Sequence, residues 1–352
     1  MDLLDTITSL SHSFGTDRYV KGGGGNTSAK NAATLWVKPS GTTLAGLTAE
    51  GFVALGRDRI DVLYNTPTPA DAKAREELVK DLMAVAVQNN AGRPSVEAPL
   101  HNVFDATYVV HTHPAAVNGM TCALKGEAFC REHFPDALWV EYIDPGYTLC
   151  MEVRRRIQDY AKRRGRQPSV LMLKNHGVFV AGNTPAEIHA IYDGIMRVLE
   201  GTYATAGIAL DVPVRPLPPD PATEARLHVL FGADAAFLVD GGRFEPAPGP
   251  LSPDHLVYAR AFPFSGELTA QAAEAYKAKH GFAPKVVVTG GRVYGLGTTR
   301  KNAGLALTFA LDSALVFQLA RAFGGAEWMT DSAREFIENW EVESYRQSVA
   351  AS

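Results

Sequence analysis

The first half of the chain alternates between two patterns of apolar and polar residues. In residues 71–88 the apolar side chains recur about every 3.6 positions, which is the period of an amphipathic helix. Short apolar runs such as LWV, residues 35–37, predict strands instead. Thr184, Pro185 and Glu187 predict a helix start, because they match the cap, the first helical position and the capping box. We therefore expect helices at residues 2–14, 71–88, from Ser95, 115–123, 151–164 and from 184, and strands at residues 34–38, 108–113, 138–142, 169–174 and 178–181.

A proline-rich segment, residues 212–223, interrupts this alternation. Proline fixes its own φ and restricts the residue before it, so we expect no helix in VPVRPLPPDPAT. We place a domain boundary here: residues 1–211 form one domain, 212–223 a linker and 224–352 a smaller C-terminal α/β extension. In the extension the pattern predicts helices at 224–231, 269–280, 299–323 and 331–345, and strands at 285–289 and 292–295.

The composition of the 352-residue chain is that of a globular protein with a substantial core. Apolar residues make up 46% and charged residues 20%, and the net charge is −4 with no block of basic residues. We therefore expect neither nucleic acid nor an anionic membrane as a partner. The three cysteines form no C-x-x-C pair, the N-terminus lacks the pattern of a signal peptide, and no apolar run approaches the length of a membrane span. These features predict a cytoplasmic protein.

Three histidines are the first candidates for chemistry. His111 and His113, in VVHTHP, lie two residues apart in a predicted strand, so their side chains point to the same side of it. Two imidazoles that converge on one point are a common arrangement around a metal ion, and zinc prefers such ligands. His176, in KNHGV, is a third candidate ligand. Taken alone, His-x-His is equally compatible with two polar residues at the end of a strand.

Two glycine-containing loops are candidates for binding an oxyanion. Residues 22–25 are four successive glycines, which allow positive φ and let an anion approach the backbone N–H groups, and residues 26–28 add polar side chains. The loop KPSGTT, residues 38–43, again combines a cation, a hydroxyl group and a glycine. Neither loop matches a P-loop or a dinucleotide-binding fingerprint. On its own, the glycine run is also typical of a flexible turn.

The segment RPSVEAPLHNVF, residues 93–104, predicts a helix that starts with Ser95 as its cap. Glu97 and His101 are then four residues apart on one helix face. Glu97 is a candidate fourth ligand or general base. As a local feature, however, a glutamate here is expected to lie on the surface and to stabilise the helix N-terminus through the helix dipole. His101 is expected to lie in the core or behind a ligand instead of binding the metal itself.

These segments, in this order, resemble the class II aldolase and adducin family. The matching motifs are Gly-Gly-Asn-Thr-Ser, Pro-Ser-Gly, Pro-Ser-x-Glu, His-x-His-Pro and Asn-His-Gly, at residues 24–28, 39–41, 94–97, 111–114 and 175–177. The resemblance implies a three-layer αβα fold with a central, mostly antiparallel sheet. Within the family, residues 251–257 and the C-terminal helices are similar to the aldolase part of bifunctional rhamnulose-1-phosphate aldolase/short-chain dehydrogenases. We expect this protein to lack their dehydrogenase part.

The resemblance also implies roles for individual residues. It implies that His111, His113 and His176 bind one Zn²⁺ or another divalent ion per chain, and that Glu97 completes the site and transfers protons. Val96 departs from the shorter family members, some of which have a second serine there. The residues implied to bind a substrate phosphate are Asn26, Thr27, Ser40, Gly41 and Ser95.

The activity implied by the resemblance is zinc-dependent aldol cleavage, which makes the protein a carbon–carbon lyase. A ketose or deoxyketose 1-phosphate would give dihydroxyacetone phosphate and an aldehyde, through an enediolate stabilised by the metal. The same site would also serve a sugar-phosphate epimerase, dehydratase or decarboxylase, and adducin-like members of the family are non-catalytic scaffolds. A Schiff base on Lys174 is the rival chemistry, and the neighbouring histidines argue against it.

Two further expectations concern the assembly and the C-terminal extension. The resemblance implies a homo-oligomer, with a tetramer favoured and active sites near subunit boundaries. Asp254 and His255, in SPDH, are candidates to reach the substrate in a neighbouring active site. The alternative is that they begin a helix that is capped by Ser252.

Overall fold

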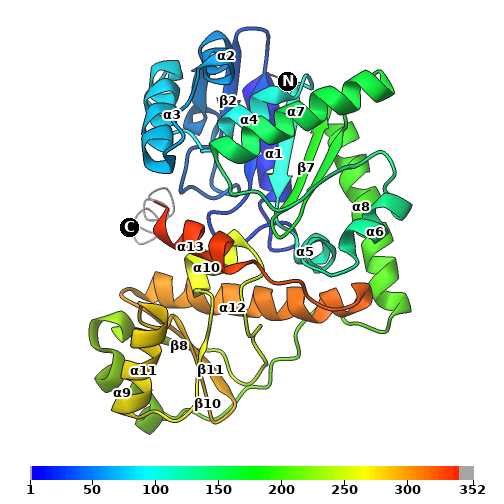
Figure 1. Ribbon diagram of the computed structural model, residues 1–352. Coiled ribbons are helices and arrows are strands. Elements are labelled where there is room, and N and C mark those ends of the chain that lie inside the picture. The colour runs from blue at the N-terminus through cyan, green and yellow to red at the C-terminus, as the bar shows by residue number, and fades with distance from the viewer. Residues whose placement is uncertain (1, 341–352) are drawn as a thin grey trace. The chain divides into compact units, whose positions relative to one another are not determined.

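The computed structural model describes residues 2–340, which form two compact units (Figure 1). Unit 1 comprises the residues up to Val117 together with Glu127–Val198, and unit 2 comprises Asn118–Gly126 together with the residues from Leu199 onward. The division falls within two helices, α5 (Ala115–Thr121) and α8 (Pro185–Thr205). The domain boundary and linker expected at residues 212–223 remain predictions.

A seven-stranded sheet forms the centre of unit 1. Its strand order is β3-β2-β1-β4-β7-β6-β5, and all neighbours are antiparallel except β5 and β6. The expected mostly antiparallel sheet is therefore confirmed. The strands are β1 (Asn26–Lys30), β2 (Thr34–Val37), β3 (Val53–Gly56), β4 (Tyr108–Thr112), β5 (Leu138–Val140), β6 (Val170–Leu173) and β7 (Gly177–Gly182).

Helices cover both faces of this sheet. Besides α5 and α8, they are α1 (Leu3–Phe14), η1 (Ala49–Gly51), α2 (Arg57–Asn65), α3 (Ala72–Ala86), α4 (Ala98–Val103), α6 (Gly126–His133) and α7 (Tyr147–Arg164). On one face, apolar residues of α4 and α7 join those of the sheet in one buried cluster (Figure 1). On the other face, Ser11 of α1 hydrogen-bonds Thr27 of β1, and Tyr192 of α8 donates to the Val110 carbonyl oxygen. The three-layer αβα architecture is therefore confirmed.

Most elements of unit 1 lie where the apolar pattern predicts them, and β1 shows why some do not. Its sequence is NTSAK, and all five residues are buried although four of them are polar. The Ser28 hydroxyl lies 2.8 Å from Nδ1 of His101, whereas the Thr27 hydroxyl lies 2.7 Å from that of Ser11. Polar partners on both faces hold this strand in place, so no alternation of apolar residues reveals it. The elements β3, α2 and α6 were not predicted either.

The helix expected to start at Ser95 begins at Ala98 instead. Glu97 occupies the N-cap position of α4, and the Ser95 hydroxyl accepts a hydrogen bond from the Glu97 N–H at 3.2 Å. Pro99 fits the first turn, because an N–H there would have no partner within the helix. Ser95 therefore caps no helix, and Glu97 precedes the helix instead of sharing a face of it with His101.

Unit 2 is built around a four-stranded sheet with the order β8-β11-β10-β9, in which only β9 and β10 are parallel. Its elements are α9 (Pro221–Phe231), η2 (Gly232–Ala235), β8 (Phe237–Asp240), α10 (Pro253–Ala259), β9 (Phe264–Ser265), α11 (Ala270–His280), β10 (Val286–Thr289), β11 (Arg292–Gly297), α12 (Arg300–Ala320), η3 (Arg321–Phe323) and α13 (Asp331–Asn339). The predicted helices are present, but residues 341–345 of the last one lie outside the described residues. This sheet confirms the expected C-terminal α/β region.

The proline-rich segment is helical at its end, so the expectation that it excludes helix is wrong for residues 221–223. Helix α9 begins at Pro221, and Asp220 caps it by accepting a hydrogen bond from the Thr223 N–H at 3.0 Å. Proline is favoured at the first helical position because its fixed φ suits the helix and its missing N–H is not needed there.

One helix of unit 2 corrects the expectation about membrane spans. The segment Arg300–Phe323 is long and apolar enough to cross a membrane by length and composition alone. Of its most apolar window, 56% is buried inside the protein. The core helix of a globular unit has the same properties, and α12 packs directly on β11, where a Cβ on Gly297 would lie 2.5 Å from the Ala303 nitrogen.

Candidate metal centre

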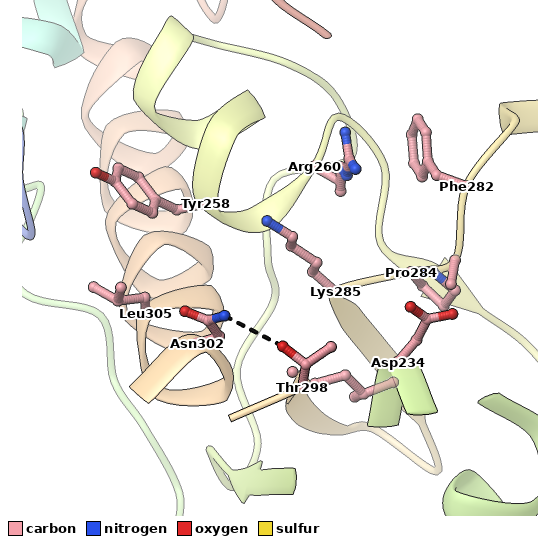
Figure 2. A pocket seen from close by; sticks show the side chains of 12 residues that line it. Asp234, Tyr258, Arg260, Phe282, Pro284, Lys285, Thr298, Asn302 and Leu305 are labelled. Carbon is pink, nitrogen blue, oxygen red and sulfur yellow. Dashed lines mark hydrogen bonds between the residues drawn. The ribbon is translucent and has the colours of Figure 1, made fainter. Parts of the chain in front are cut away.

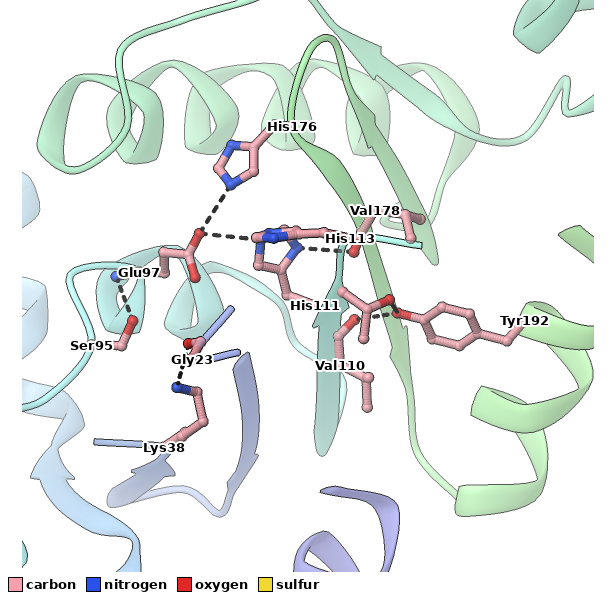
Figure 3. A network of polar contacts seen from close by, with 11 residues as sticks. Gly23, Lys38, Ser95, Glu97, Val110, His111, His113, His176, Val178 and Tyr192 are labelled. Atoms are coloured by element: carbon pink, nitrogen blue, oxygen red, sulfur yellow. Dashed lines mark hydrogen bonds and ion pairs between the residues drawn. The ribbon is translucent and has the colours of Figure 1, made fainter. Parts of the chain in front are cut away.

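His111 lies at the centre of the candidate site, in β4. Its ring stacks on that of Phe179, with 3.8 Å between the centroids, and its Nδ1 lies 2.9 Å from the Val178 carbonyl oxygen (Figure 3). A carbonyl oxygen only accepts hydrogen bonds, so Nδ1 carries the proton and Nε2 presents a lone pair. Burial lowers the pKa of His111, although the Glu97 carboxylate opposes this shift. The ring is therefore held in the neutral form that binds metal ions.

Two further histidines bring their rings next to His111. His113 follows the last residue of β4, and its backbone N–H donates to the Tyr19 carbonyl oxygen at 3.0 Å. The Nε2 atoms of His113 and His111 lie 2.8 Å apart. His176 lies in the turn between β6 and β7, where Asn175 adopts a positive φ of 54°. The ligand nitrogens of all three histidines lie within 4.8 Å of one another, which is close enough to share one ion.

Gly177 lets β7 pass close to these histidines. A Cβ at this position would lie 2.5 Å from the Thr112 carbonyl oxygen and 2.7 Å from Cδ2 of His113. Gly177→Ala is therefore expected to lower the free energy of unfolding by roughly 1–3 kcal/mol, because overpacking forces neighbouring atoms to move. Chemical denaturation measures this loss. The matched control is Gly194→Ala in α8, where the added Cβ meets open space. It should raise stability by about 0.5–1 kcal/mol, and an equal loss in both variants would contradict the steric explanation.

Glu97 brings a carboxylate to the three rings. Its Oε1 lies 3.2 Å from Nε2 of His111 and 3.6 Å from Nε2 of His176 (Figure 3). The residue is only 6% exposed, and its side chain makes no capping hydrogen bond to α4. The interpretation of Glu97 as a surface residue that stabilises the helix N-terminus is therefore wrong. A carboxylate so placed is suited to binding an ion or to accepting a proton.

Asn26 lies beside His111 on the neighbouring strand. The two residues are partners in the antiparallel β1–β4 pair, so their side chains point to the same face of the sheet. Both polar side-chain atoms of Asn26 are buried, and neither has a hydrogen-bond partner within residues 2–340. Leaving a buried amide unsatisfied costs roughly 1–3 kcal/mol. This orphaned amide fits a site that binds a polar ligand next to the histidines.

Lys38 connects the two glycine-containing loops. Its buried ammonium group donates to carbonyl oxygens of both loops, at 3.3 Å to Gly23 and 2.8 Å to Thr42. The second loop is also bound to the Pro-Ser segment, because the Ser40 N–H donates to the Arg93 carbonyl oxygen at 2.9 Å. The structure thus brings together the three segments predicted to bind phosphate. The sequence indicated Lys38 only as the cation of its loop and not as the residue that joins the loops.

The predicted phosphate ligands differ in what their side chains contact. Ser40 and Ser95 are buried at the junction of these segments, and Gly41 adopts a positive φ of 84°. The hydroxyl of Thr27, by contrast, lies 2.7 Å from that of Ser11, on the sheet face opposite to the histidines. The structure therefore does not bring the Thr27 side chain to the candidate site.

Two other residues next to the motifs are engaged in structural contacts. The Lys174 ammonium group lies 3.4 Å from a carboxylate oxygen of Glu141, so it is an ion-paired lysine. His101 is fully buried, its Nδ1 lies 2.8 Å from the Ser28 hydroxyl, and burial lowers its pKa to about 3. His101 therefore lies in the core, which is one of the two positions that the sequence predicted for it.

His255 is buried within unit 2. Its Nδ1 lies 3.0 Å from the Ser252 hydroxyl, and its Nε2 lies 3.0 Å from a carboxylate oxygen of Asp312. Ser252 occupies the N-cap position of α10 as the alternative interpretation expected, but its hydroxyl contacts this ring instead of capping the helix. Both ring nitrogens are thus engaged inside unit 2. A contact of His255 with substrate remains a prediction.

The site in unit 1 fits a divalent metal ion. Three ring nitrogens converge, a backbone carbonyl fixes one ring as is usual for metal-binding histidines, and a carboxylate lies beside them. Three protein ligands leave a position open for substrate, which is typical of catalytic and not of structural zinc sites.

More than half of the chain is similar to known proteins. Residues 5–200 match the family described as the Class II Aldolase and Adducin N-terminal domain. The uncharacterized oxidoreductase YuxG of Bacillus subtilis (strain 168) is 30% identical over 192 residues, which are 51% of this chain and 27% of that protein. The match therefore covers about a quarter of the length of YuxG, 27%.

Two solved structures share part of the backbone arrangement. The N-terminal class II aldolase domain of a conserved protein from Thermoplasma acidophilum is 24% identical, with a TM-score of 0.49 over 56% of this chain and 92% of that one. L-Fuculose-1-phosphate aldolase from Thermus thermophilus is 14% identical, with a TM-score of 0.37 over 56% of this chain and 92% of that one.

Proposed function

This chain belongs to the class II aldolase and adducin family, and we propose that it is a metal-dependent aldolase that acts on a sugar phosphate. The substrate would be a ketose or deoxyketose 1-phosphate, and the products would be dihydroxyacetone phosphate and an aldehyde. The observation that carries this proposal is the convergence of three histidine nitrogens and the Glu97 carboxylate. The ion pair of Lys174 favours metal chemistry over a Schiff base.

His111, His113 and His176 would hold the ion, and Zn²⁺ is well suited to three imidazole ligands. When bound, a divalent ion would draw electrons from the substrate carbonyl and stabilise the negative charge that carbon–carbon cleavage leaves. Cleavage turns a substrate hydroxyl into the aldehyde carbonyl, so that hydroxyl loses its proton. The electron pair of the broken bond stays on the carbon next to the ketone carbonyl, and this carbon must gain a proton before the product departs. Glu97 is our candidate for that proton transfer, because its carboxylate is buried beside the ring nitrogens.

We further propose that the loops joined by Lys38 bind the substrate phosphate. The backbone N–H groups and hydroxyls of these loops are donors suited to an oxyanion, and the ammonium group of Lys38 adds positive charge close to them. Asn26 would then donate to an oxygen of the substrate, which would satisfy its buried amide.

Ser40→Ala is expected to raise KM for a phosphorylated substrate by about tenfold or more, because it removes a hydrogen bond to a charged group. The kcat/KM for an unphosphorylated analogue should change little. Steady-state kinetics with both substrates measure this difference. Ser13→Ala, at an exposed serine of α1, is the control and should leave both values unchanged. Equal losses with both substrates would refute the phosphate assignment.

The proposed activity is tested directly by incubating the zinc-loaded protein with a panel of ketose 1-phosphates. Release of dihydroxyacetone phosphate, detected by a coupled assay, is the expected result. If the protein holds its metal but releases none of this product from any member of the panel, the aldolase proposal fails. Conversion that leaves the carbon skeleton intact would then identify an epimerase or a dehydratase. A homo-oligomer, with a tetramer favoured, and a cytoplasmic location remain predictions.

A further inference from the structure

Unit 2 contains a cavity of about 400 Å³ that no motif of the sequence revealed (Figure 2). It lies where α10 ends, β10 begins and β11 leads into α12. Its lining includes the hydrogen-bond donors Arg260, Lys285, Thr298 and Asn302, the carboxylate of Asp234, and the apolar ring of Phe282. The cavity therefore combines donors with apolar surface, as sites for small organic ligands do.

Within residues 2–340, no ion pair neutralises the two basic residues of this cavity, Arg260 and Lys285. The Lys285 ammonium group donates to the Val257 carbonyl oxygen at 2.9 Å, and the Arg260 guanidinium group lies over the Phe282 ring at 4.5 Å from its centroid. Nε of Arg260 is buried without a hydrogen-bond partner in the part of the chain that the structure describes. Among the same residues, neither cation has a carboxylate within 4.0 Å. Burial, together with the nearby charge of Arg260, lowers the pKa of Lys285 to about 7.

The backbone of Arg260 is in a conformation that glycine adopts far more easily. Its φ is 68° and its ψ is 165°, directly after the last residue of α10. This region of φ and ψ is almost exclusive to glycine, and non-glycine residues found there cluster at ligand-binding and active sites. An arginine in this strained conformation, where a glycine would fit better, is consistent with a role of its side chain in binding a ligand.

The first turn of α12 lies next to the cavity and contains two exposed basic residues. Thr299 caps this helix by accepting a hydrogen bond from the Asn302 N–H at 3.1 Å. Arg300 and Lys301 follow, and the turn contains no acidic residue. Cations at a helix N-terminus oppose the helix dipole, so a bound anion would offset their unfavourable interaction.

Two acidic residues of the described chain, Asp234 and Glu338, act electrostatically on Arg260, but neither forms an ion pair with it. Asp234 lines the rim but is exposed, so water and salt screen its charge. Glu338 acts on Arg260 at longer range, and one of its two carboxylate oxygens accepts a hydrogen bond from Arg334 at 2.6 Å. Among the described residues, the lining of the cavity therefore carries two basic side chains and one exposed carboxylate.

We infer that this cavity binds the phosphate group of a small molecule, at a site separate from the metal centre. Two cations, the Thr298 hydroxyl and the Asn302 amide supply donors for an anion with several acceptor oxygens. The volume exceeds that of a bare phosphate ion, and Phe282 offers apolar surface for a short carbon chain. The inference involves unit 2 alone and stands whether or not unit 1 is an aldolase.

Competitive acetylation of lysines in the full-length protein tests this site directly. The protein is treated with acetic anhydride at constant ionic strength, with inorganic phosphate, glycerol 3-phosphate or acetate added, and modified lysines are quantified by peptide mass spectrometry. Phosphate at a few times its Kd should slow acetylation of Lys285 by about fivefold relative to Lys279, an exposed lysine of α11. Protection by glycerol 3-phosphate as well would identify a phosphate ester as a ligand, and protection by inorganic phosphate alone would identify the free ion.

Arg260→Gly provides the matched variant. Glycine suits the positive φ, so the variant should fold with an unchanged or higher Tm while losing the protection of Lys285 by phosphate. Arg321→Gln, which removes one charge from an exposed position of unit 2, should retain the protection. The inference is overturned if phosphate leaves the acetylation of Lys285 unchanged in the wild type, if acetate protects as well as phosphate does, or if Arg260→Gly keeps full protection.

Discussion

Replacing His113 with alanine is expected to remove most of the divalent metal from the protein. Its Nε2 lies 2.8 Å from that of His111, and the ligand nitrogens of the three histidines lie within 4.8 Å of one another, so one lost ring leaves an incomplete ligand set. Changes outside the ligand set typically weaken metal binding by about 10–100-fold, so loss of a ligand should weaken it by about 100-fold or more. His113 is a better target than His111, because His113 is partly exposed and His111 is fully buried.

Metal analysis by mass spectrometry after dialysis against a defined zinc buffer measures this loss. His133→Ala is the control, because His133 is an exposed histidine at the end of α6. It should retain a full equivalent of metal, and both variants should keep the circular dichroism spectrum of the wild type. A His113→Ala protein that binds zinc as tightly as the wild type would end the assignment of this residue as a ligand.

Glu97→Gln is expected to preserve the fold and most of the metal but to lose turnover. Glutamine has nearly the shape of glutamate, but its amide cannot accept a proton from the reacting carbon or return one to it. The buried Glu97 carboxylate lies 3.2 Å from Nε2 of His111, so replacing it changes the candidate metal centre directly. General acid–base catalysis typically contributes about 10²–10⁴-fold, so kcat should fall by about 100-fold or more.

The kinetic measurement requires a metal analysis of the same preparation, because a variant without metal would be inactive for another reason. Glu50→Gln, at an exposed position of η1, is the matched control and should keep wild-type kcat. Activity of Glu97→Gln within about threefold of the wild type would show that Glu97 is not the proton-transfer residue.

The sequence predicted that His111 and His113 converge, because spacing on a strand fixes side-chain direction. His111 and His113 were expected to point to one side of a strand, and their rings meet in the structure. The position of Glu97 was harder to predict, because its local sequence favoured a helix start on the surface. Its burial depends on how α4 packs on the sheet, and that packing is set by residues far away along the chain.

Other features could not be predicted because their signals are polar or not periodic. Strand β1 is held by hydrogen bonds from its polar side chains, so the apolar pattern missed it, and with it the position of Asn26 beside His111. The cavity of unit 2 depends on the conformation of Arg260, and no propensity scale predicts an arginine at a positive φ.

The register between β1 and β4 also limits how this protein can tolerate insertions and deletions during evolution. Asn26 lies opposite His111, and a shift by one residue would turn every side chain of β1 to the other face of the sheet. Thr27 would then face the histidines, and Asn26 would face α1. Changes of length close to β1 should therefore be rejected by selection. The mostly exposed segment of residues 66–71, between α2 and α3, should tolerate them, because no paired strand begins or ends there.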